Sequence, residues 1–390
     1  MDADYVIAGG GIGGSVLAEL LGRGGKRVVV LEKSTAPPSW LRPEVLWPAT
    51  MKVLFSLVPQ QIWEQEDVLA VRGMELHDDR GTLPFITSQL LREAGIQPWF
   101  INPNSTRERL LRLRSFEARR GVEVVAVLKE KERVVGVRTR ELATSAEREV
   151  LAQCTIGDDG GQSVVRQACN IPFHPRMFPF DFLCFAFDWP AALPAATACI
   201  WLNRRWVQSG ILALLAMPLA QGKGAGLVPA RPWIFDNLER THEEWHRFVS
   251  ADPAMQPVTG NRKLPGDFAR VRRAWGHAPR YGGEGALLLG DAAHPVSPAG
   301  GQGANMSVAD ACALAEIVLS NHPQPLAEYE RRRRPANQRS LLFTRVAARV
   351  FGLPNWCLRL LPFGLRQAMS RPWLVRRFVQ TAATAFQERR

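Results

Sequence analysis

The chain has few cysteines, and none of them forms a recognisable metal or disulfide motif. Its six cysteines are scattered through 390 residues, without a Cys-x-x-Cys pair. Neither a zinc site nor a disulfide framework is predicted from this spacing, and no other group of metal ligands stands out along the sequence. A reducing, cytoplasmic compartment is the expected setting.

The sequence also lacks a segment with the length and composition of a membrane span. Its longest uncharged apolar stretch, residues 206–222, is short for a span and contains Gln208, Pro218 and Gln221. No basic leader precedes an apolar run at the N-terminus, so we expect no signal peptide. Apolar residues make up 46% of the chain and charged residues 22%, which indicates a folded globular protein with more than one domain.

Acidic residues are nearly absent from the last part of the chain. Residues 331–390 contain fourteen arginines and one acidic residue, Glu388, whereas the preceding part is close to neutral. Apolar side chains alternate with these arginines, and Pro354, Pro362 and Pro372 interrupt the pattern, which predicts basic amphipathic helices. Such a tail either docks on an anionic membrane surface or packs on the body with a solvated basic face. Nucleic-acid binding is disfavoured because the charge accompanies a large apolar face.

The N-terminal segment has the pattern of a dinucleotide-binding unit. Residues 4–8 predict a strand, residues 9–14 a glycine turn, the next residues a helix to about Leu21, and residues 27–31 a second strand. The glycines allow a tight turn and a close approach of backbone amides to a pyrophosphate at the helix N-terminus. An acid at the end of the second strand can bind an adenosine ribose. The candidate cofactor-binding residues here are Gly9, Gly11, Ile12, Gly13, Gly14, Glu32 and Lys33.

Three later segments carry a resemblance to a known family. They are Gly-Asp-Asp-Gly-Gly-Gln-Ser-Val-Val-Arg at residues 157–166, Leu-Leu-Leu-Gly-Asp-Ala-Ala-His-Pro at residues 287–295, and Pro-Ala-Gly-Gly-Gln-Gly-Ala-Asn at residues 298–305. Together with the glycine turn, they resemble the FAD-dependent aromatic hydroxylases typified by para-hydroxybenzoate hydroxylase, with kynurenine 3-monooxygenase and ubiquinone-pathway hydroxylases as relatives. The resemblance covers most of residues 1–335 and implies that FAD is the cofactor.

The resemblance assigns roles to individual residues. It implies that Asp159 lies in a segment touching both FAD and the pyridine nucleotide, and that Asp291, beside Gly290, holds the ribityl chain. It places Arg42 and Pro295 near the reacting ring as catalytic candidates, and it makes Arg42 a cofactor contact as well. Arg107 corresponds to a cofactor-binding arginine at a helix start, with Arg109 as the alternative. The Tyr-Glu-Arg-Arg-Arg-Arg-Pro stretch at residues 329–335 resembles one that closes the nucleotide lobe.

The segment at residues 298–305 also has a physical reading of its own. Its glycines free backbone amides ahead of a helix expected from residue 305 to residue 319, and such a terminus suits the electron-rich edge of a reduced flavin. The candidate residues are Pro298, Gly300, Gly303, Ala304 and Asn305. His294 is more simply read as a hydrogen-bonded loop histidine than as a catalytic base.

The rest of the chain suggests how the lobes are organised. Residues 72–99 and 172–266 hold short runs typical of strands, residues 105–120 predict a helix, and residues 123–130 and 133–140 predict a hairpin. We therefore expect an α/β fold with a Rossmann-like FAD-binding lobe assembled from discontinuous segments, an inserted, mainly antiparallel β substrate domain and a C-terminal helical tail. The expected divisions are 1–71, 100–171 and 267–335 for the FAD-binding domain, 72–99 and 172–266 for the substrate domain, and 336–390 for the tail.

The resemblance implies a monooxygenase. NAD(P)H would reduce FAD, dioxygen would form a flavin C4a-hydroperoxide, and this would hydroxylate an aromatic or lipophilic substrate. No second strand-linked Gly-x-Gly-x-x-Gly is present, which fits transient NAD(P)H binding and fits a partner reductase equally well. The expected pocket lining comes from the β region, from strands containing Phe182, Phe185, Phe187, Trp201 and Leu214.

Other functions remain open at this point. An isoprenoid reductase or a flavin-dependent halogenase shares the nucleotide lobe, although the tryptophan signature of the halogenases and the Trp-x-Phe-Pro motif of the reductases are missing. A flavin-binding, membrane-associated redox protein without turnover is a further alternative. Substrate identity, the choice between NADH and NADPH, and the oligomeric state are not encoded in these motifs.

Overall fold

The computed structural model describes most of the chain. The described residues are 1–42, 44–202, 210–250, 253–260, 262, 267–351, 353, 357 and 360–388. Part of the apolar stretch at residues 206–222, and Pro354 in the tail, lie outside them.

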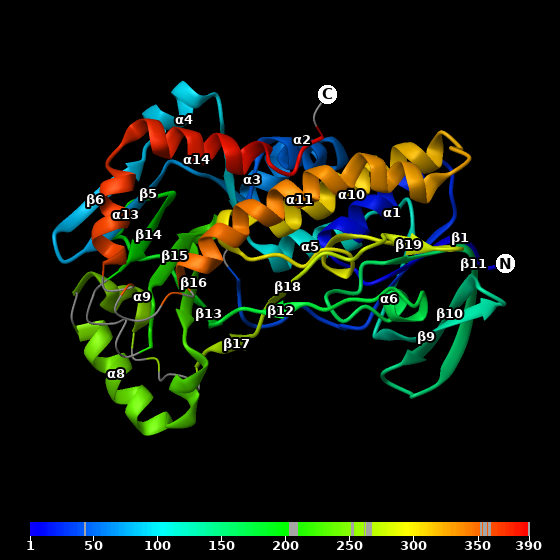
Figure 1. Cartoon of the computed structure of the whole chain (residues 1–390), viewed down its shortest axis with the longest axis horizontal. Helices are drawn as coiled ribbons and strands as arrows, with labels where there is room; N and C mark the ends of the chain where they lie inside the picture. The colour runs from blue at the N-terminus through cyan, green and yellow to red at the C-terminus, as the bar shows by residue number, and fades with distance from the viewer. Residues whose placement is uncertain are drawn as a thin grey trace.

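A twisted, mainly parallel sheet forms the lobe that contains both the N-terminal strand and the Gly290 segment (Figure 1). Its strand order is β19-β20-β11-β1-β2-β8, and β10 and β9 continue from β11 as an antiparallel hairpin. The strands are β1 (Ala3–Ala8), β2 (Val28–Glu32), β8 (Glu117–Arg120), β9 (Val122–Glu130), β10 (Arg133–Glu141), β11 (Glu147–Gly157), β19 (Gly282–Gly283) and β20 (Ala286–Leu288). The expected Rossmann-like arrangement of discontinuous segments is thereby confirmed.

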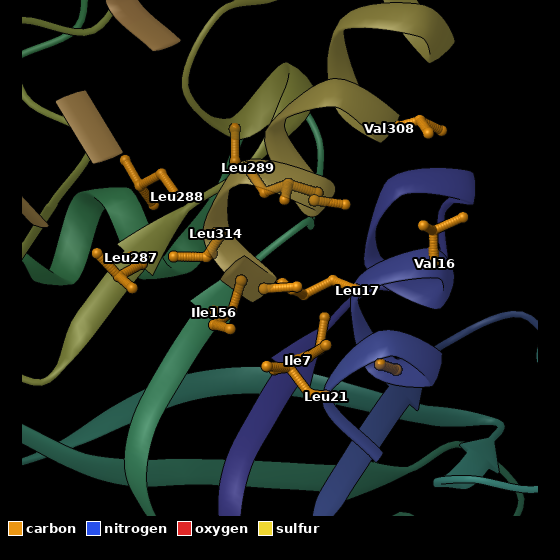
Figure 2. Packing of buried hydrophobic residues seen from close by; sticks show 14 of the residues in the cluster. Ile7, Val16, Leu17, Leu21, Ile156, Leu287, Leu288, Leu289, Val308 and Leu314 are labelled. Atoms are coloured by element: carbon orange, nitrogen blue, oxygen red, sulfur yellow. The ribbon is translucent and has the colours of Figure 1, made fainter. Parts of the chain in front are cut away.

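Helix α1 (Ile12–Arg23) connects β1 to β2 and packs against α10 (Gln302–Leu319). Figure 2 shows Val16, Leu17 and Leu21 of α1 gathered with residues of β1, β11, β20 and α10. These side chains are removed from water, and burial of this kind is the main favourable term in folding. The core therefore holds the glycine turn at the carboxyl end of β1, where ligands bind in open parallel sheets.

The second lobe is built on a seven-stranded sheet at the other end of the molecule (Figure 1). Its order is β17-β13-β16-β15-β14-β5-β6, and among these pairs only β14 with β5 is parallel. The strands are β5 (Gly73–Asp78), β6 (Gly81–Ile86), β13 (Asp181–Asp188), β14 (Thr197–Trp201), β15 (Leu214–Pro218), β16 (Lys223–Ala230) and β17 (Ala269–Val271). This confirms the mainly antiparallel β region. Helix α8 (Leu238–Ser250), which covers one face, was not expected from the sequence.

Shorter elements connect the two lobes. Two small sheets pair β3 (Glu44–Leu46) and β4 (Val68–Ala70) with β7 (Trp99–Ile101), and β12 (Arg176–Met177) with β18 (Ala274–Trp275). The remaining short helices are α2 (Pro48–Leu57), α3 (Gln60–Glu66), α4 (Ser88–Ala94), α5 (Pro103–Leu111), α6 (Val164–Ala168), α9 (Gln256–Thr259), η1 (Ala220–Gly222), η2 (Pro232–Asp236), η3 (Pro253–Met255), η4 (Gly290–Ala292) and η5 (Ala299–Gly301).

The hairpin prediction is confirmed, but the helix predicted over residues 105–120 is too long. The hairpin turns at Lys131, whose φ is +56°. The helix ends at Leu111, and residues from Glu117 form strand β8, which pairs with β2 at the sheet edge. Pairing with a neighbouring strand overrides the local helical preference of this charged stretch.

The C-terminal tail is helical and packs on the body. Helix α11 (Pro325–Phe351) continues through Pro335, and α13 (Leu361–Met369) and α14 (Pro372–Thr384) follow. Helix α14 buries Val375, Val379 and Ala382 in a cluster shared with α4 and β6. Among the described residues, no helix is both long and apolar enough to cross a membrane.

Candidate active site

The glycine turn after β1 is built for close approach. Gly9 has a φ of +99°, and a Cβ atom there would lie 2.3 Å from the carbonyl oxygen of Asp158. A Cβ on Gly13 would lie 1.9 Å from Ser307 Oγ. Larger residues cannot fit without shifting β11 or α10, so the glycines bring three segments of the chain together at the N-terminus of α1.

Glu32 ends β2 beside this turn. Its carboxylate accepts hydrogen bonds from the backbone N–H of Gly10 at 2.9 Å and of Ser34 at 2.7 Å. Burial alone would raise the pKa of Glu32, but these N–H groups and Arg107 outweigh it and lower the pKa. Glu32 is therefore held ionised, as a hydrogen-bond acceptor.

Arg107 lies on α5 and faces the same space. Its Nη2 atom is 3.1 Å from Glu32 Oε1, yet its buried Nε and Nη2 groups form no hydrogen bond. Buried guanidinium donors without partners are costly, so this position calls for a ligand. Arg109, the alternative from the sequence, instead pairs with Glu66 and Asp67.

Arg107 and the Gly11–Gly13 part of the turn line one cavity of about 370 Å³, whereas Glu32 is not among its lining residues and reaches it only through its contacts with Gly10 and Arg107. The cavity extends from the glycine turn past Arg107 to two ion pairs, Arg42 with Glu44 and Arg273 with Asp291. The described lining residues are Gly11, Ile12, Gly13, Pro38, Trp40, Arg42, Glu44, Pro103, Asn104, Arg107, Asp158, Gly160, Arg273, Asp291, Gly303, Ala304 and Ser307.

Two ion pairs also line the cavity. Arg42 Nε lies 2.8 Å from Glu44 Oε1, and Arg273 Nη1 lies 3.2 Å from Asp291 Oδ2. The charge of Glu44 raises the pKa of Arg42, and Asp291 adds to this effect. Two cations and two anions therefore sit side by side, where they can bind polar groups of a ligand.

Asp158 and Asp159 have different surroundings. The Asp158 carboxylate accepts a hydrogen bond from Gly14 N at 2.9 Å, at the start of α1. Burial raises the pKa of Asp158 well above its usual value, and the nearby carboxylates of Asp159, Asp291 and Glu32 add to the shift. The Asp159 carboxylate accepts from Val164 N at 2.7 Å and caps α6. Asp158 thus lines the cavity, whereas the side chain of Asp159, the sequence candidate, is used within the protein.

The loop ahead of α10 is only partly exposed to the cavity. Gly303 and Ala304 line it, whereas Asn305 accepts a hydrogen bond from Trp47 N at 2.9 Å and donates to Val45 O at 3.0 Å. Gly300 has a φ of +74°, which permits the turn, and Pro298 precedes it. Of the sequence candidates in this loop, Gly303 and Ala304 therefore line the cavity, whereas the others shape the loop.

Three further candidates lie outside the cavity lining. Pro295 is buried, and its carbonyl accepts from Gly276 N at 3.0 Å. His294 is buried and bonds Asp310, which agrees with the reading of a loop histidine. Lys33 is exposed to solvent.

Several residues of this cavity were not among the sequence candidates, and Arg273, Asp158 and Trp40 are the most informative of them. Arg273 follows a segment assigned to no motif, and only its pairing with Asp291 reveals it. Asp158 was present inside a quoted motif, but the neighbouring Asp159 was chosen. Trp40 lies in a loop without periodicity, and its carbonyl is held by Asn104 Nδ2 at 3.1 Å.

The residues predicted to line the substrate pocket do not share one face of the sheet, because side chains alternate along a strand. Phe185, Trp201 and Leu214 pack in the cluster that meets α8, on the outer face of the seven-stranded sheet. Phe187 belongs to that cluster and also lines a second cavity, described below. Phe182 and Cys184 project to the opposite face, because successive side chains of β13 alternate, and join a cluster that includes Trp40.

A second, larger cavity of about 980 Å³ adjoins the first and shares Asn104 with it. It lies between α5 and the strands β13 and β16. Its charged lining residues are Glu66, Asp67, Glu108, Arg109, Arg112, Asp188, Lys223 and Arg262. Positive and negative groups balance, so the charge of this cavity gives no preference for an anion.

The groups in and around the smaller cavity suit the parts of FAD. The backbone of the glycine turn and the N-terminus of α1 suit a pyrophosphate, and Glu32 suits a ribose. The partnerless donors of Arg107 provide hydrogen bonds that the protein itself leaves unused. The narrow space beside Gly11 and Gly13 explains why side chains are absent at those positions.

Comparison with known proteins agrees with this geometry. The family model described as an FAD binding domain matches residues 2–344. The 3-hydroxybenzoate 6-hydroxylase of Klebsiella oxytoca is 27% identical over 368 residues, 89% of this chain and 88% of that protein.

Two solved structures share the fold. PqsL of Pseudomonas aeruginosa in complex with 2-aminobenzoylacetate has a TM-score of 0.74 at 23% identity and covers 93% of this chain and 99% of its own. The p-nitrophenol 4-monooxygenase PnpA of Pseudomonas putida DLL-E4 has a TM-score of 0.76 at 19% identity, covering 100% and 99%. This chain belongs to the FAD binding domain family and is an FAD-dependent enzyme of the monooxygenase class.

Proposed function

We propose that FAD binds in an extended form with its pyrophosphate at the glycine turn, and that the 370 Å³ cavity holds part of the cofactor. Gly11, Ile12 and Gly13 would give backbone N–H groups, Glu32 would accept from the adenosine ribose, and Arg107 would use its free donors. Asp291 would hold the ribityl chain once its pairing with Arg273 adjusts. The buried Arg107 Nε and Nη2 groups, which form no hydrogen bond although Nη2 pairs with Glu32, are the observation that carries this assignment.

The remaining sequence candidates take secondary places in this proposal. Gly303 and Ala304 would meet the flavin ring directly, since they line the cavity. Gly9, Gly14, Gly290, Pro298, Gly300 and Asn305 would shape the turns around it. Pro295 would act through the position of its loop. Asp159 would act through α6, and Lys33 would reach the cofactor only at its solvent-exposed adenosine end.

We propose that the substrate is a small aromatic compound, which this enzyme hydroxylates. The cavity end at Arg42 and Arg273 lies beside Trp40, and Trp40 packs with Phe178, Phe180 and Phe182. Aromatic walls with a few convergent charges are typical of pockets for planar, polar-substituted ligands. The hydroxylase relative acts on such a compound by its name.

In this reaction the bound flavin supplies the electrons and the activated oxygen. The side chains of this chain hold the ring of the substrate near the flavin, orient it through Arg42 or Arg273, and exclude water. NAD(P)H is the proposed reductant, bound transiently. The proposed division into domains is 1–71, 100–171 and 267–335 for FAD and 72–99 and 172–266 for the substrate, except that β17 (Ala269–Val271) pairs with β13 and belongs to the second sheet.

The hydroxylation is tested with labelled dioxygen. Purified enzyme, NADPH or NADH, and a panel of phenols, anilines and quinolones are incubated under ¹⁸O₂, and products are analysed by mass spectrometry. One labelled oxygen atom in an aromatic product supports hydroxylation. Oxidation of the nucleotide without label in any product favours an isoprenoid reductase or a halogenase, and bound flavin without any turnover favours a redox-sensing protein.

A second proposal concerns the tail. Helices α11, α13 and α14, and Leu360 just before α13, leave large apolar side chains exposed: Leu342, Leu360, Phe363, Trp373 and Phe378 are between 44% and 64% accessible. Arginines alternate with them in the sequence, a combination that binds anionic lipid surfaces. We propose that this surface docks peripherally on such a membrane, which would give access to lipophilic substrates.

Docking is tested by liposome flotation with surface variants, because a truncation at Pro335 would cut through α11. Trp373→Glu and Leu360→Glu should float less than the unaltered protein on vesicles containing phosphatidylserine. Leu142→Glu is the matched control, because Leu142 is an exposed leucine that directly follows β10 and lies outside the tail. Equal flotation of all four proteins contradicts docking by the tail.

A further inference from the structure

Three potential metal ligands meet on the outer face of the seven-stranded sheet. Glu75 and His77 lie on β5, and Cys199 lies on β14. One ligand atom from each side chain lies within 4.8 Å of the other two. His77 Nε2 and Glu75 Oε2 are 3.6 Å apart. This separation is close to that of two ligands sharing one ion, since tetrahedral zinc has bonds of about 2.0–2.3 Å.

The strand register explains why these side chains converge. Cys199 is the direct neighbour of Glu75 in the parallel pair of β14 and β5, and Trp201 is the neighbour of His77. Residues two apart on a strand share a face, so Glu75 and His77 point the same way. These ligands form no motif in the sequence because they come from strands that are far apart in the chain.

His77 is held in place by two neighbours. Its ring stacks on Trp201, with centroids 4.9 Å apart and planes 20° from parallel. Its Nδ1 atom shares a hydrogen bond of 3.1 Å with Thr82 Oγ1 on β6. When Nδ1–H donates to that hydroxyl, the lone pair of Nε2 is directed to the side of Glu75, which is how second-sphere partners orient metal-binding histidines.

The cluster has the composition of a zinc site and a route for the ion. A thiol, an imidazole and a carboxylate together favour a borderline-soft divalent cation over Mg²⁺ or Ca²⁺. Cys199 is fully buried, whereas the side chains of His77 and Glu75 are 13% and 22% exposed. An ion can therefore enter from the solvent side, and water can take the fourth position.

We propose that Glu75, His77 and Cys199 bind one Zn²⁺ ion, outside the flavin cavity. The S–H bond of Cys199 breaks as the Zn–S bond forms, and the proton passes to solvent. The site lies on the face opposite to Ala198, which packs in the cluster containing Val296 and Met306 near the flavin loop. The ion would thus tie β5 to β14 and support the sheet from behind, without taking part in the oxidation.

The test is metal content of the untagged, flavin-loaded protein. The His246→Gln background removes a competing exposed pair on α8, where His242 Nε2 and His246 Nε2 lie 3.1 Å apart. After chelator treatment and equilibrium dialysis against Zn²⁺, this protein should retain about one ion per chain. Cys199→Ser, His77→Gln and Glu75→Gln should each lose it. Cys184→Ser is the control, because Cys184 is a buried cysteine of β13 outside the cluster.

Two further measurements keep the test decisive. Co²⁺-loaded minus Zn²⁺-loaded difference spectra, in which the flavin absorbance cancels, should show a thiolate-to-metal band that Cys199→Ser lacks. Thr82→Val should weaken Zn²⁺ binding by roughly 10- to 100-fold. Because Glu75 is partly exposed, Glu75→Gln should keep its fold and flavin and still lose the ion. No bound Zn²⁺ in the background protein, or equal Zn²⁺ in the three ligand variants, overturns the proposal.

Discussion

Arg333 Nε donates a hydrogen bond of 2.8 Å to Asp310 Oδ1, and both side chains are at most 1% exposed. The pair joins α11 to α10, the helix that follows the flavin loop. Asp310 also bonds His294 Nε2 at 2.5 Å and accepts from Asn337 Nδ2 at 3.0 Å. Arg333 in turn donates to the carbonyl of Phe386, after α14. One buried network thus connects the loop, the core and the end of the chain.

Removing Arg333 should therefore destabilise the whole fold. Arg333→Ala leaves the Asp310 carboxylate buried with fewer partners, which costs about 3–5 kcal/mol for a buried ion pair. Thermal or urea unfolding would measure the loss. Arg331→Ala is the matched control, because Arg331 is exposed and pairs only at the surface with Glu328. If both variants unfold alike, the network does not stabilise the protein as described.

The same network should make stability depend on pH. Burial alone would raise the pKa of Asp310, but its interactions with His294 and Arg333 hold it well below its usual range. A lowered pKa in the folded state means that the stabilisation is present above the unfolded pKa, and is lost as pH falls through the folded value. The free energy of unfolding should therefore fall less with decreasing pH in Asp310→Asn than in the unaltered protein, although this variant starts from a lower stability.

His277 adds a second pH dependence in a milder range. Burial lowers its pKa from 6.5 to about 4, and the nearby His294 contributes. Between pH 6.5 and about pH 4, His277 is protonated in the unfolded chain but stays neutral in the folded protein. The free energy of unfolding should therefore decrease as the pH is lowered through this range. His277→Gln should flatten that part of the profile in thermal unfolding between pH 7 and pH 4. An unchanged slope would show that His277 does not titrate in this way.

The glycine turn gives a prediction about packing. Gly13→Ala brings a methyl group against Ser307 Oγ and within 2.8 Å of Leu289 Cδ2, and such overpacking costs about 1–3 kcal/mol. The protein should lose bound flavin and unfold earlier. Adding Ser307→Gly should recover part of both losses by removing the nearest atom. Gly364→Ala, inside α13, where a Cβ meets no atom within 4 Å, should leave flavin binding unchanged and should not lower the unfolding temperature.

The assignment of Arg107 predicts a specific loss of cofactor affinity. Arg107→Met removes guanidinium groups that form no hydrogen bond within the protein, together with the ion pair to Glu32. FAD binding should therefore weaken roughly 10- to 100-fold, while stability without flavin falls much less. Flavin fluorescence titration of the apoprotein measures this. Arg112→Met, an exposed arginine just after the same helix, is the control. Equal affinity of the Arg107 variant would remove Arg107 from the site.

The FAD lobe could be predicted because its signals are local. The turn at Gly9, Gly11 and Gly14 lies between a strand and a helix, and Glu32 follows at the end of the next strand, so spacing alone identifies the unit. The hairpin around Lys131 was likewise set by adjacent residues. Strand β8 was missed because its conformation depends on pairing with β2, which no local preference records.

The ligand-facing details could not be predicted because they depend on side-chain direction. Asp158 and Asp159 are neighbours in one motif, yet one faces the turn of α1 and the other caps α6. The strand containing Phe185 was expected to line the substrate pocket, but side chains alternate between the two faces of β13, and that of Phe185 lies on the face covered by α8. Arg273 became visible only through Asp291, which is distant in sequence but adjacent in space.

The most direct test of the account is the absorbance spectrum of the purified protein during anaerobic addition of NADPH or NADH, with and without single aromatic compounds. The account predicts bound flavin whose absorbance bleaches, and one aromatic compound that accelerates the bleaching. Bound flavin that neither nucleotide reduces, with any compound present, would contradict an NAD(P)H-dependent aromatic hydroxylase.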